Sequence, residues 1–154
     1  MTIKDQLQSD LTNAMRTRDE VKVATLRMAL AAITKTEVAG KEHVSLSDGE
    51  IVAVMRTEMK KRHEAANMYE TGGRADRATR ERAEAEVLAG YLPPAIDDDA
   101  LVAIVSEEVA VVEATGATGG KAMGAVVKAV RARAGDGADG ARIAALVKVA
   151  LGLT

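Results

Sequence analysis

The stretch SDGEIVAVMRTEM, residues 47–59, decides the fold class of this chain of 154 residues. Ser47 and Glu50 have the S-x-x-E spacing of a capping box, in which each side chain bonds the other residue's backbone amide at the start of a helix. Behind it, apolar residues recur at the helical spacing i, i+3, i+4 and i+8, at Ile51, Val54, Met55 and Met59. The spacing predicts a helix that begins after Ser47 and turns one apolar face to a core.

The same period recurs along the rest of the chain and predicts an all-α protein without strands. The composition agrees, because the chain is rich in alanine, the best helix former, and has no Phe or Trp and only two Tyr. The second helix is expected to begin at Asp19 and to end at a cap on Gly40. The expected helices cover about residues 2–17, 19–40, 47–69, 76–91, 97–115, 121–133 and 143–151.

A domain boundary is expected at Pro93-Pro94. Two consecutive prolines end the fourth helix, because proline lacks the amide proton that helix hydrogen bonds need. Asp97 then caps the next helix. We therefore expect a helical N-terminal domain over residues 1–92 and a small three-helix C-terminal domain over residues 97–154.

The net charge of −2 hides a separation of charge along the chain. Residues 1–96 hold fifteen basic and fifteen acidic side chains, and residues 97–115 hold six acidic side chains and no basic one. Residues 116–154 hold six basic side chains against two acidic ones. Because local charge governs docking to polyanions, the last segment is the candidate for such a partner.

Other motifs favour ordinary structural roles. The absence of cysteine excludes disulfides, thiol catalysis and zinc sites that need cysteine ligands. The G-x-G-x-x-G match at residues 135–140 follows a helix and not the strand that a dinucleotide site requires, so it predicts a helix connection. Asp97–Asp99 suit a helix N-terminus, and His43 and His63 lack a metal-ligand pattern. Lys60–Arg62 are typical of a solvated helix face. No catalytic residue, metal or cofactor is predicted.

The candidate site lies in the basic segment. Lys121 follows Gly119-Gly120 at the expected start of a helix, where free backbone amides and the helix dipole favour phosphate. With almost no aromatic side chains to stack on bases, an RNA partner would be bound through its backbone and shape. The predicted nucleic-acid-binding residues are Gly120, Lys121, Lys128, Arg131, Arg133 and Arg142. The alternative is that these charges serve solubility alone.

Four segments resemble the YqeY family, whose small proteins are related to the tail domain of GatB, the B subunit of the tRNA-dependent amidotransferase. They are TLRMALAAI at residues 25–33, EVL with YLP at residues 86–93, GKAMGAV at residues 120–126 and ADG at residues 138–140. Their order and spacing extend the resemblance over essentially the whole chain.

The resemblance implies a helical N-terminal domain, a small three-helix domain and a link to tRNA, which the GatB tail grips. It also points to translation and to carbon–nitrogen ligases that use glutamine as the amido donor, although residues for that chemistry are absent. At the two positions that flank Ala138–Gly140 the family usually carries basic residues, whereas this chain has Gly137 and Ala141.

We therefore expect a non-catalytic accessory protein that binds tRNA. The alternatives are a protein–protein adaptor that docks through its acidic and aliphatic helices, and a stand-alone enzyme. The N-terminal sequence has no apolar signal core, and no apolar run is long enough to span a bilayer, so a cytoplasmic protein without membrane contact is expected.

Overall fold

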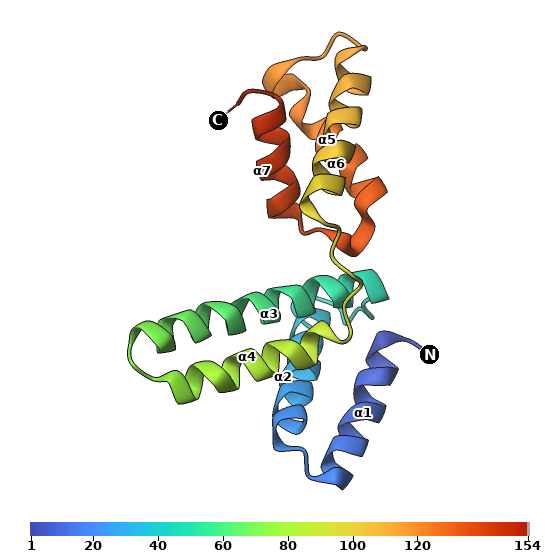
Figure 1. Ribbon diagram of the computed structural model, residues 1–154. Coiled ribbons are helices and arrows are strands. Elements are labelled where there is room, and N and C mark those ends of the chain that lie inside the picture. Colours follow the sequence, from blue (N-terminus) through green and yellow to red (C-terminus); the bar gives the residue numbers. More distant parts are fainter. Residues whose placement is uncertain (154) are drawn as a thin grey trace. The chain divides into compact units, whose positions relative to one another are not determined.

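Seven α-helices and two short 3-10 helices make up the part of the chain that the computed structural model describes, residues 1–153 without the side chain of Asp136 (Figure 1). The same residues contain no strand, so the all-α prediction is confirmed. The chain divides into two compact units, Met1–Leu92 and Pro93–Thr154.

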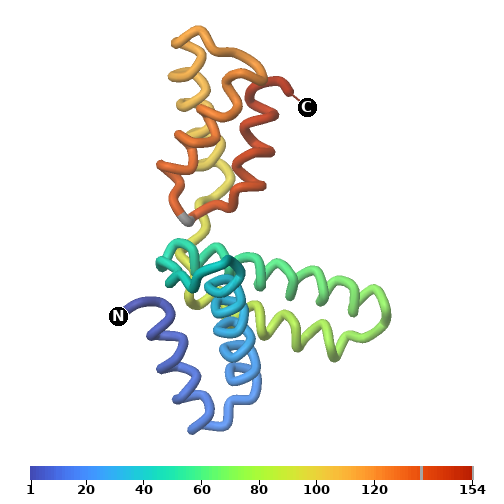
Figure 2. Tube along the Cα trace, turned by 180° about the vertical axis from the view of Figure 1, so that it is seen from behind, coloured from blue at the N-terminus to red at the C-terminus, as the bar shows by residue number. Residues whose placement is uncertain are grey.

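The first unit consists of α1 (Ile3–Thr17), α2 (Glu20–Glu37), α3 (Asp48–Thr71) and α4 (Ala75–Ala89). In both views α3 and α4 lie side by side as a long antiparallel hairpin (Figures 1 and 2). The core of the unit lies where α1 and α2 meet the beginning of α3 and the end of α4. Its largest fully buried side chains are Leu7, Leu26, Ile33, Ile51, Met55 and Leu88.

Capping boxes begin two of these helices. The Glu50 amide donates to Ser47 Oγ at 3.3 Å, and the Ser47 amide donates to Glu50 Oε2 at 2.8 Å, as the sequence predicts. This bond from the backbone amide of Ser47 lowers the pKa of Glu50, because it stabilises the ionised carboxylate. Thr2 and Asp5 form the corresponding pair at the start of α1.

The prediction that α2 ends at Gly40 is wrong. The helix ends at Glu37, and Val38 occupies the cap position. Glu37 is 2% exposed, and its carboxylate accepts hydrogen bonds from Lys4 Nζ at 2.7 Å and from the Leu46 amide at 3.3 Å. Its carbonyl oxygen accepts from the Val44 amide at 3.0 Å. The chain turns here because these contacts bring residues 44–46 back to the end of α2, three residues before the glycine.

The second unit consists of α5 (Asp98–Glu113), η1 (Gly119–Lys121), α6 (Met123–Ala134), η2 (Gly135–Gly137) and α7 (Gly140–Ala150). Asp97 caps α5 as predicted, since its carboxylate accepts from the Ala100 amide at 2.8 Å. The segment matching G-x-G-x-x-G connects two helices, also as predicted. The three α-helices enclose one apolar core, formed chiefly by Leu101, Val105, Val126, Val130, Ile143 and Val147.

Candidate nucleic-acid interface

Three of the predicted cations are exposed along α6 and in the turn before it. Lys128 and Arg131 lie one helical turn apart on α6, and Lys121 lies in the turn that precedes the helix. Val126 and Val130 on the opposite face of α6 are fully buried in the core, which turns the cations outward. Among the described residues, none of the three has an acidic side chain within ion-pair distance. We call Lys121, Lys128 and Arg131 the α6 stripe.

The start of α6 differs from the sequence prediction. Lys121 lies in the 3-10 turn η1, and α6 begins two residues later at Met123, with Ala122 at the cap position. The cap position offers no side-chain hydrogen bond to the first amides of the helix. The uncapped backbone amides are therefore those at the start of α6, from Met123 on, and not the amide of Lys121.

Two glycines leave the backbone beside the α6 stripe uncovered. A Cβ atom at Gly120 or at Gly124 would meet no other atom within 4 Å, so neither glycine is required by packing. Gly124 is exposed within α6, where glycine costs about 1 kcal/mol of helix stability relative to alanine. The two positions let a ligand approach the main chain closely, just before Lys121 at Gly120 and between the two lysines at Gly124.

Arg131 packs against the first turn of α7. A Cβ atom at Gly140 would lie 3.1 Å from Arg131 Nη2 and 3.5 Å from its Cζ. The missing side chain of Gly140 therefore provides the space in which the guanidinium lies. This contact between α6 and α7 gives Arg131 a defined position at the end of the stripe.

Arg133 and Arg142 lie elsewhere and are ion-paired within the unit. Arg133 Nη1 lies 2.6 Å from Glu107 Oε2 and 3.2 Å from Glu108 Oε1, and hydrogen bonds to these carboxylates raise the pKa of Arg133. Arg142 Nη2 pairs with Asp98 and donates to the Ile96 carbonyl oxygen at 2.9 Å. Both arginines thus hold the acidic segment 97–115 against the other helices. Sequence reasoning separated the acidic and basic segments but did not pair them.

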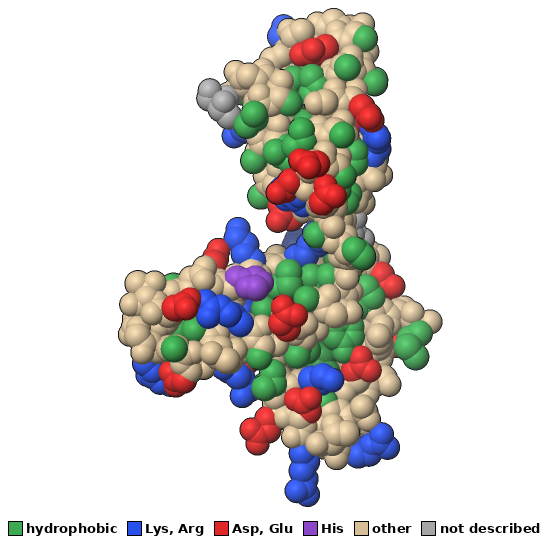
Figure 3. Space-filling view, viewed as in Figure 1, with side chains coloured by type: hydrophobic (Ala, Val, Ile, Leu, Met, Phe, Trp, Pro, Cys, Tyr) green, Lys and Arg blue, Asp and Glu red, His purple; other side chains and the backbone are tan. Residues whose placement is uncertain are grey.

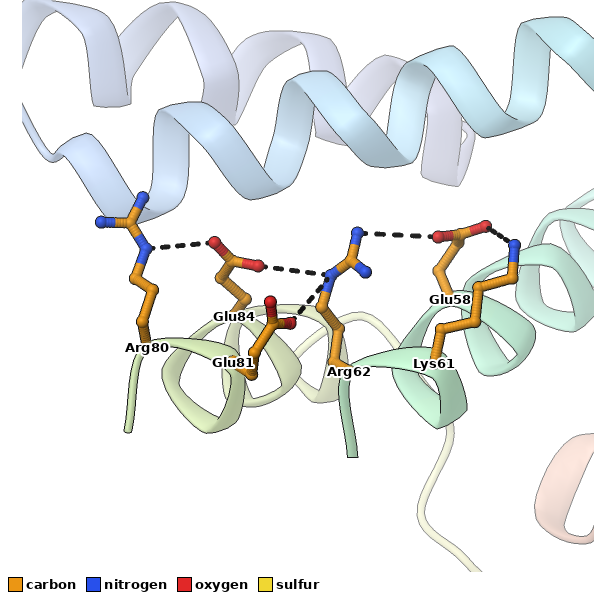
Figure 4. Close-up of polar contacts among 6 residues, drawn as sticks. All are labelled: Glu58, Lys61, Arg62, Arg80, Glu81 and Glu84. Atoms are coloured by element: carbon orange, nitrogen blue, oxygen red, sulfur yellow. Dashed lines mark hydrogen bonds and ion pairs between the residues drawn. The ribbon is translucent and has the colours of Figure 1, made fainter. Parts of the chain in front are cut away.

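The run Lys60-Lys61-Arg62 also contains both ion-paired and unpaired side chains. Figure 4 shows Arg62 between α3 and α4, where its guanidinium faces three carboxylates at 3.3–3.7 Å, those of Glu58, Glu81 and Glu84. Lys61 pairs with Glu58 at 2.9 Å, and Arg80 pairs with Glu84 at 3.0 Å. Lys60 takes no part in this network and stays exposed. Two members of the run are therefore neutralised and one is not.

Three other features of the described part of the chain bear on its function: a partly buried tyrosine, its metal-ligating side chains and the hydropathy of its helices. Burial raises the pKa of Tyr91, whose hydroxyl donates to Asp10 and ties α4 to α1. No group of three His, Cys, Asp or Glu side chains among the described residues is placed to hold a metal ion. None of the helices described here is both long and apolar enough to cross a membrane. The α6 stripe therefore stays the candidate binding surface.

Comparisons with known proteins identify the family. The family model of the Yqey-like proteins matches residues 4–151. The Altered inheritance of mitochondria protein 41, mitochondrial, of Pyrenophora tritici-repentis (strain Pt-1C-BFP) is 25% identical over 133 residues, which cover 85% of this chain and 72% of that protein. Because that relative's name places it in mitochondria, a cytoplasmic location stays a prediction for this chain. Since the family model extends through both units, the chain belongs to the YqeY family.

Proposed function

We propose that the second unit binds tRNA through its phosphate backbone, as an accessory activity without catalysis of its own. The observation that carries the proposal is the α6 stripe, three exposed cations on α6 and in the turn before it, without an acidic partner among the described residues. Elsewhere in the same unit the arginines are paired with carboxylates. A cation left unpaired in a chain of net charge −2 is available to an external anion.

Two further features favour RNA backbone over base recognition. The chain has two tyrosines, both in the first unit, so the second unit has no aromatic surface on which bases could stack. Gly120, just before Lys121, and Gly124, between the two lysines, leave open backbone where a phosphate or ribose can approach. Such a surface reads the spacing of phosphates and the shape of a folded RNA.

Arg133 and Arg142 have a different role in this proposal from the one expected from the sequence. Their guanidinium groups are directed to Glu107, Glu108 and Asp98, so they position the helices that carry the stripe. Direct phosphate contact is assigned to Lys121, Lys128 and Arg131. Lys148, exposed near the end of α7, is the remaining basic residue of the segment.

The test replaces the three stripe residues together, as Lys121→Gln, Lys128→Gln and Arg131→Gln. A matched control removes the same number of charges at exposed positions of the first unit, as Lys22→Gln, Lys35→Gln and Lys41→Gln. Binding of unfractionated tRNA is measured by filter binding at three salt concentrations. Each lost phosphate contact lowers the log–log salt slope by about 0.7 to 0.9, so the stripe variant should lose about two units or more.

The control should keep the salt slope of the original protein, and circular dichroism should show equal helicity in all three proteins. Equal losses in the two variants would contradict a specific surface. If the original protein shows no salt-sensitive binding of tRNA, the adaptor alternative becomes the better proposal. That alternative is favoured by Val111 and Val149, which are 61% and 63% exposed on α5 and α7.

A further inference from the structure

A second line of unpaired basic side chains lies on α3, in the first unit. Arg56, Lys60 and His63 follow the spacing i, i+4 and i+7, so they share one face of the helix. At a rise of 1.5 Å per residue, their backbones are spaced by about 6 Å and about 4.5 Å along the helix axis. Figure 3 shows Lys, Arg and His side chains on this side of the hairpin, with Asp and Glu side chains among them.

The other basic side chains of the α3–α4 hairpin have partners, whereas those of this line do not. In the α3–α4 hairpin, Lys61, Arg62, Arg74, Arg80 and Arg82 all pair with carboxylates. Arg77 lies over the ring of Tyr69, 5.7 Å from its centre. Among the described residues, Arg56, Lys60 and His63 have neither kind of partner. The acids nearest to them in sequence are Glu58, which pairs with Lys61 and Arg62, and Glu64, which is exposed and makes no ion pair with them.

The same face continues into a hollow at the end of α3. Asn67 and Thr71 extend the spacing by four residues each, and with Met68 and Gly72 they line an open hollow of about 440 Å³. The hollow is open and not enclosed, so a base or ribose would contact it on one side. The exposed amide of Asn67 and the thioether of Met68, which is 76% exposed, offer one polar and one apolar contact there.

We propose that this face of α3 is a second nucleic-acid site, in which Arg56, Lys60 and His63 contact successive phosphates and the hollow receives a base or ribose. The site lies on the first unit and therefore goes beyond the proposed function, which concerns the α6 stripe alone. Arginine and lysine supply charged donors, and a histidine ring carries at least one N–H donor in either protonation state. Charge complementarity selects the phosphate chain, and the hollow distinguishes a nucleotide from a simple polyanion.

The methionines allow the two sites to be tested separately in the full chain. Met68 lines the hollow on α3, and Met123, the only methionine of the second unit, begins α6 beside Lys121. Met55 is fully buried in the first unit and serves as an internal control. The protein is labelled with 13C at the methionine methyl groups, and each signal is assigned with a Met→Leu variant. Unfractionated tRNA and inorganic polyphosphate are then titrated separately.

With tRNA, the Met68 methyl signal should shift in a saturable way while the Met55 signal stays in place. The double variant Arg56→Gln, Lys60→Gln should abolish this shift and lower the salt slope of tRNA binding by about 1.4 to 1.8. The control variant Lys22→Gln, Lys35→Gln should leave both unchanged. Polyphosphate should compete for tRNA but leave the Met68 signal in place, because it has no group to enter the hollow.

Each negative result has its own meaning. An unmoved Met68 signal at saturating tRNA overturns the α3 site, whatever happens at Met123. An unmoved Met123 signal with a shifted Met68 signal instead contradicts the proposed function and leaves the α3 site standing. A Met68 shift of equal size with polyphosphate would overturn the assignment of the hollow to a nucleotide.

Discussion

The backbone amide of Ile96 donates a hydrogen bond to the carbonyl oxygen of Gly137 at 2.8 Å, and the Ile96 side chain covers the place where a side chain of residue 137 would begin. A Cβ atom at Gly137 would lie 2.6 Å from Ile96 Cγ1, closer than packed carbon atoms can approach. The resemblance to the YqeY family leads to the expectation of a basic residue at this position. The contact with Ile96 gives a steric reason why this chain has glycine.

Restoring the basic residue as Gly137→Lys should destabilise the second unit. Because Ile96 must move out of its partly buried position, the expected loss is about 1 to 3 kcal/mol in the free energy of unfolding. Urea unfolding followed by circular dichroism measures it. The double variant with Ile96→Ala should recover part of the loss, since it removes the clashing atoms. An additive double variant would show that the two residues are not in contact.

Replacing the open glycine of α6, as Gly124→Ala, should stabilise the second unit. The added methyl group meets no atom within 4 Å, and alanine favours a helix over glycine by about 1 kcal/mol. Thermal unfolding should therefore shift upward. If the α6 stripe binds phosphate between the lysines, the same variant should bind tRNA more weakly. A gain in both stability and affinity would contradict close approach at this position.

Removing the cap of α3, as Ser47→Ala, should lower the free energy of unfolding by about 1 kcal/mol. The change deletes the acceptor of the Glu50 amide and the reciprocal contact of the capping box. Ser106, an exposed serine within α5, offers a control at which Ser→Ala should have little effect or a small stabilising one. Equal stabilities for Ser47→Ala and the original protein would contradict the prediction.

Acid should weaken the first unit through Glu37. The hydrogen bond from Lys4, and a weaker one from the Leu46 amide, lower the pKa of this carboxyl in the folded state. A group with a lowered folded pKa stabilises the protein above its unfolded value, about 4.3 for glutamate, and loses this effect as the pH falls through the folded value. Glu37→Gln should therefore be less stable at pH 7 and should depend less on pH below about 5. An unaltered pH profile would show that Glu37 does not contribute.

The two units are predicted to be separate domains, with a boundary in residues 93–96. Each unit has its own buried core, formed by different residues. A protease site inserted after Pro94 should therefore yield two fragments that separate on gel filtration and keep their helical circular dichroism. The C-terminal fragment, which begins at Ala95, should be the less stable, because a domain of this size buries little apolar surface. Loss of helicity in both fragments on cleavage would contradict the domain prediction.

Much of the fold could be predicted because helix starts are local. The bonds that Ser47 and Asp97 make at their helices span only three residues, so their residue types and spacing are visible in the sequence. The apolar period of α5 and α6 likewise showed which sides are buried. These features made the all-α class and most helix bounds predictable from the amino-acid sequence alone.

The end of α2 and the free or paired state of each cation were decided by tertiary structure. Glu37, at the end of α2, accepts from the Leu46 amide and pairs with Lys4, which lies 33 positions away, and Arg142 pairs with Asp98 across 44 positions. Within one run of three basic residues, Arg62 is paired across the hairpin and Lys60 is exposed. Charge is a property of the residue type and can be counted in a sequence. Whether a charge is neutralised depends on which helices the fold brings within about 4 Å of it, because ion pairs form only at that range.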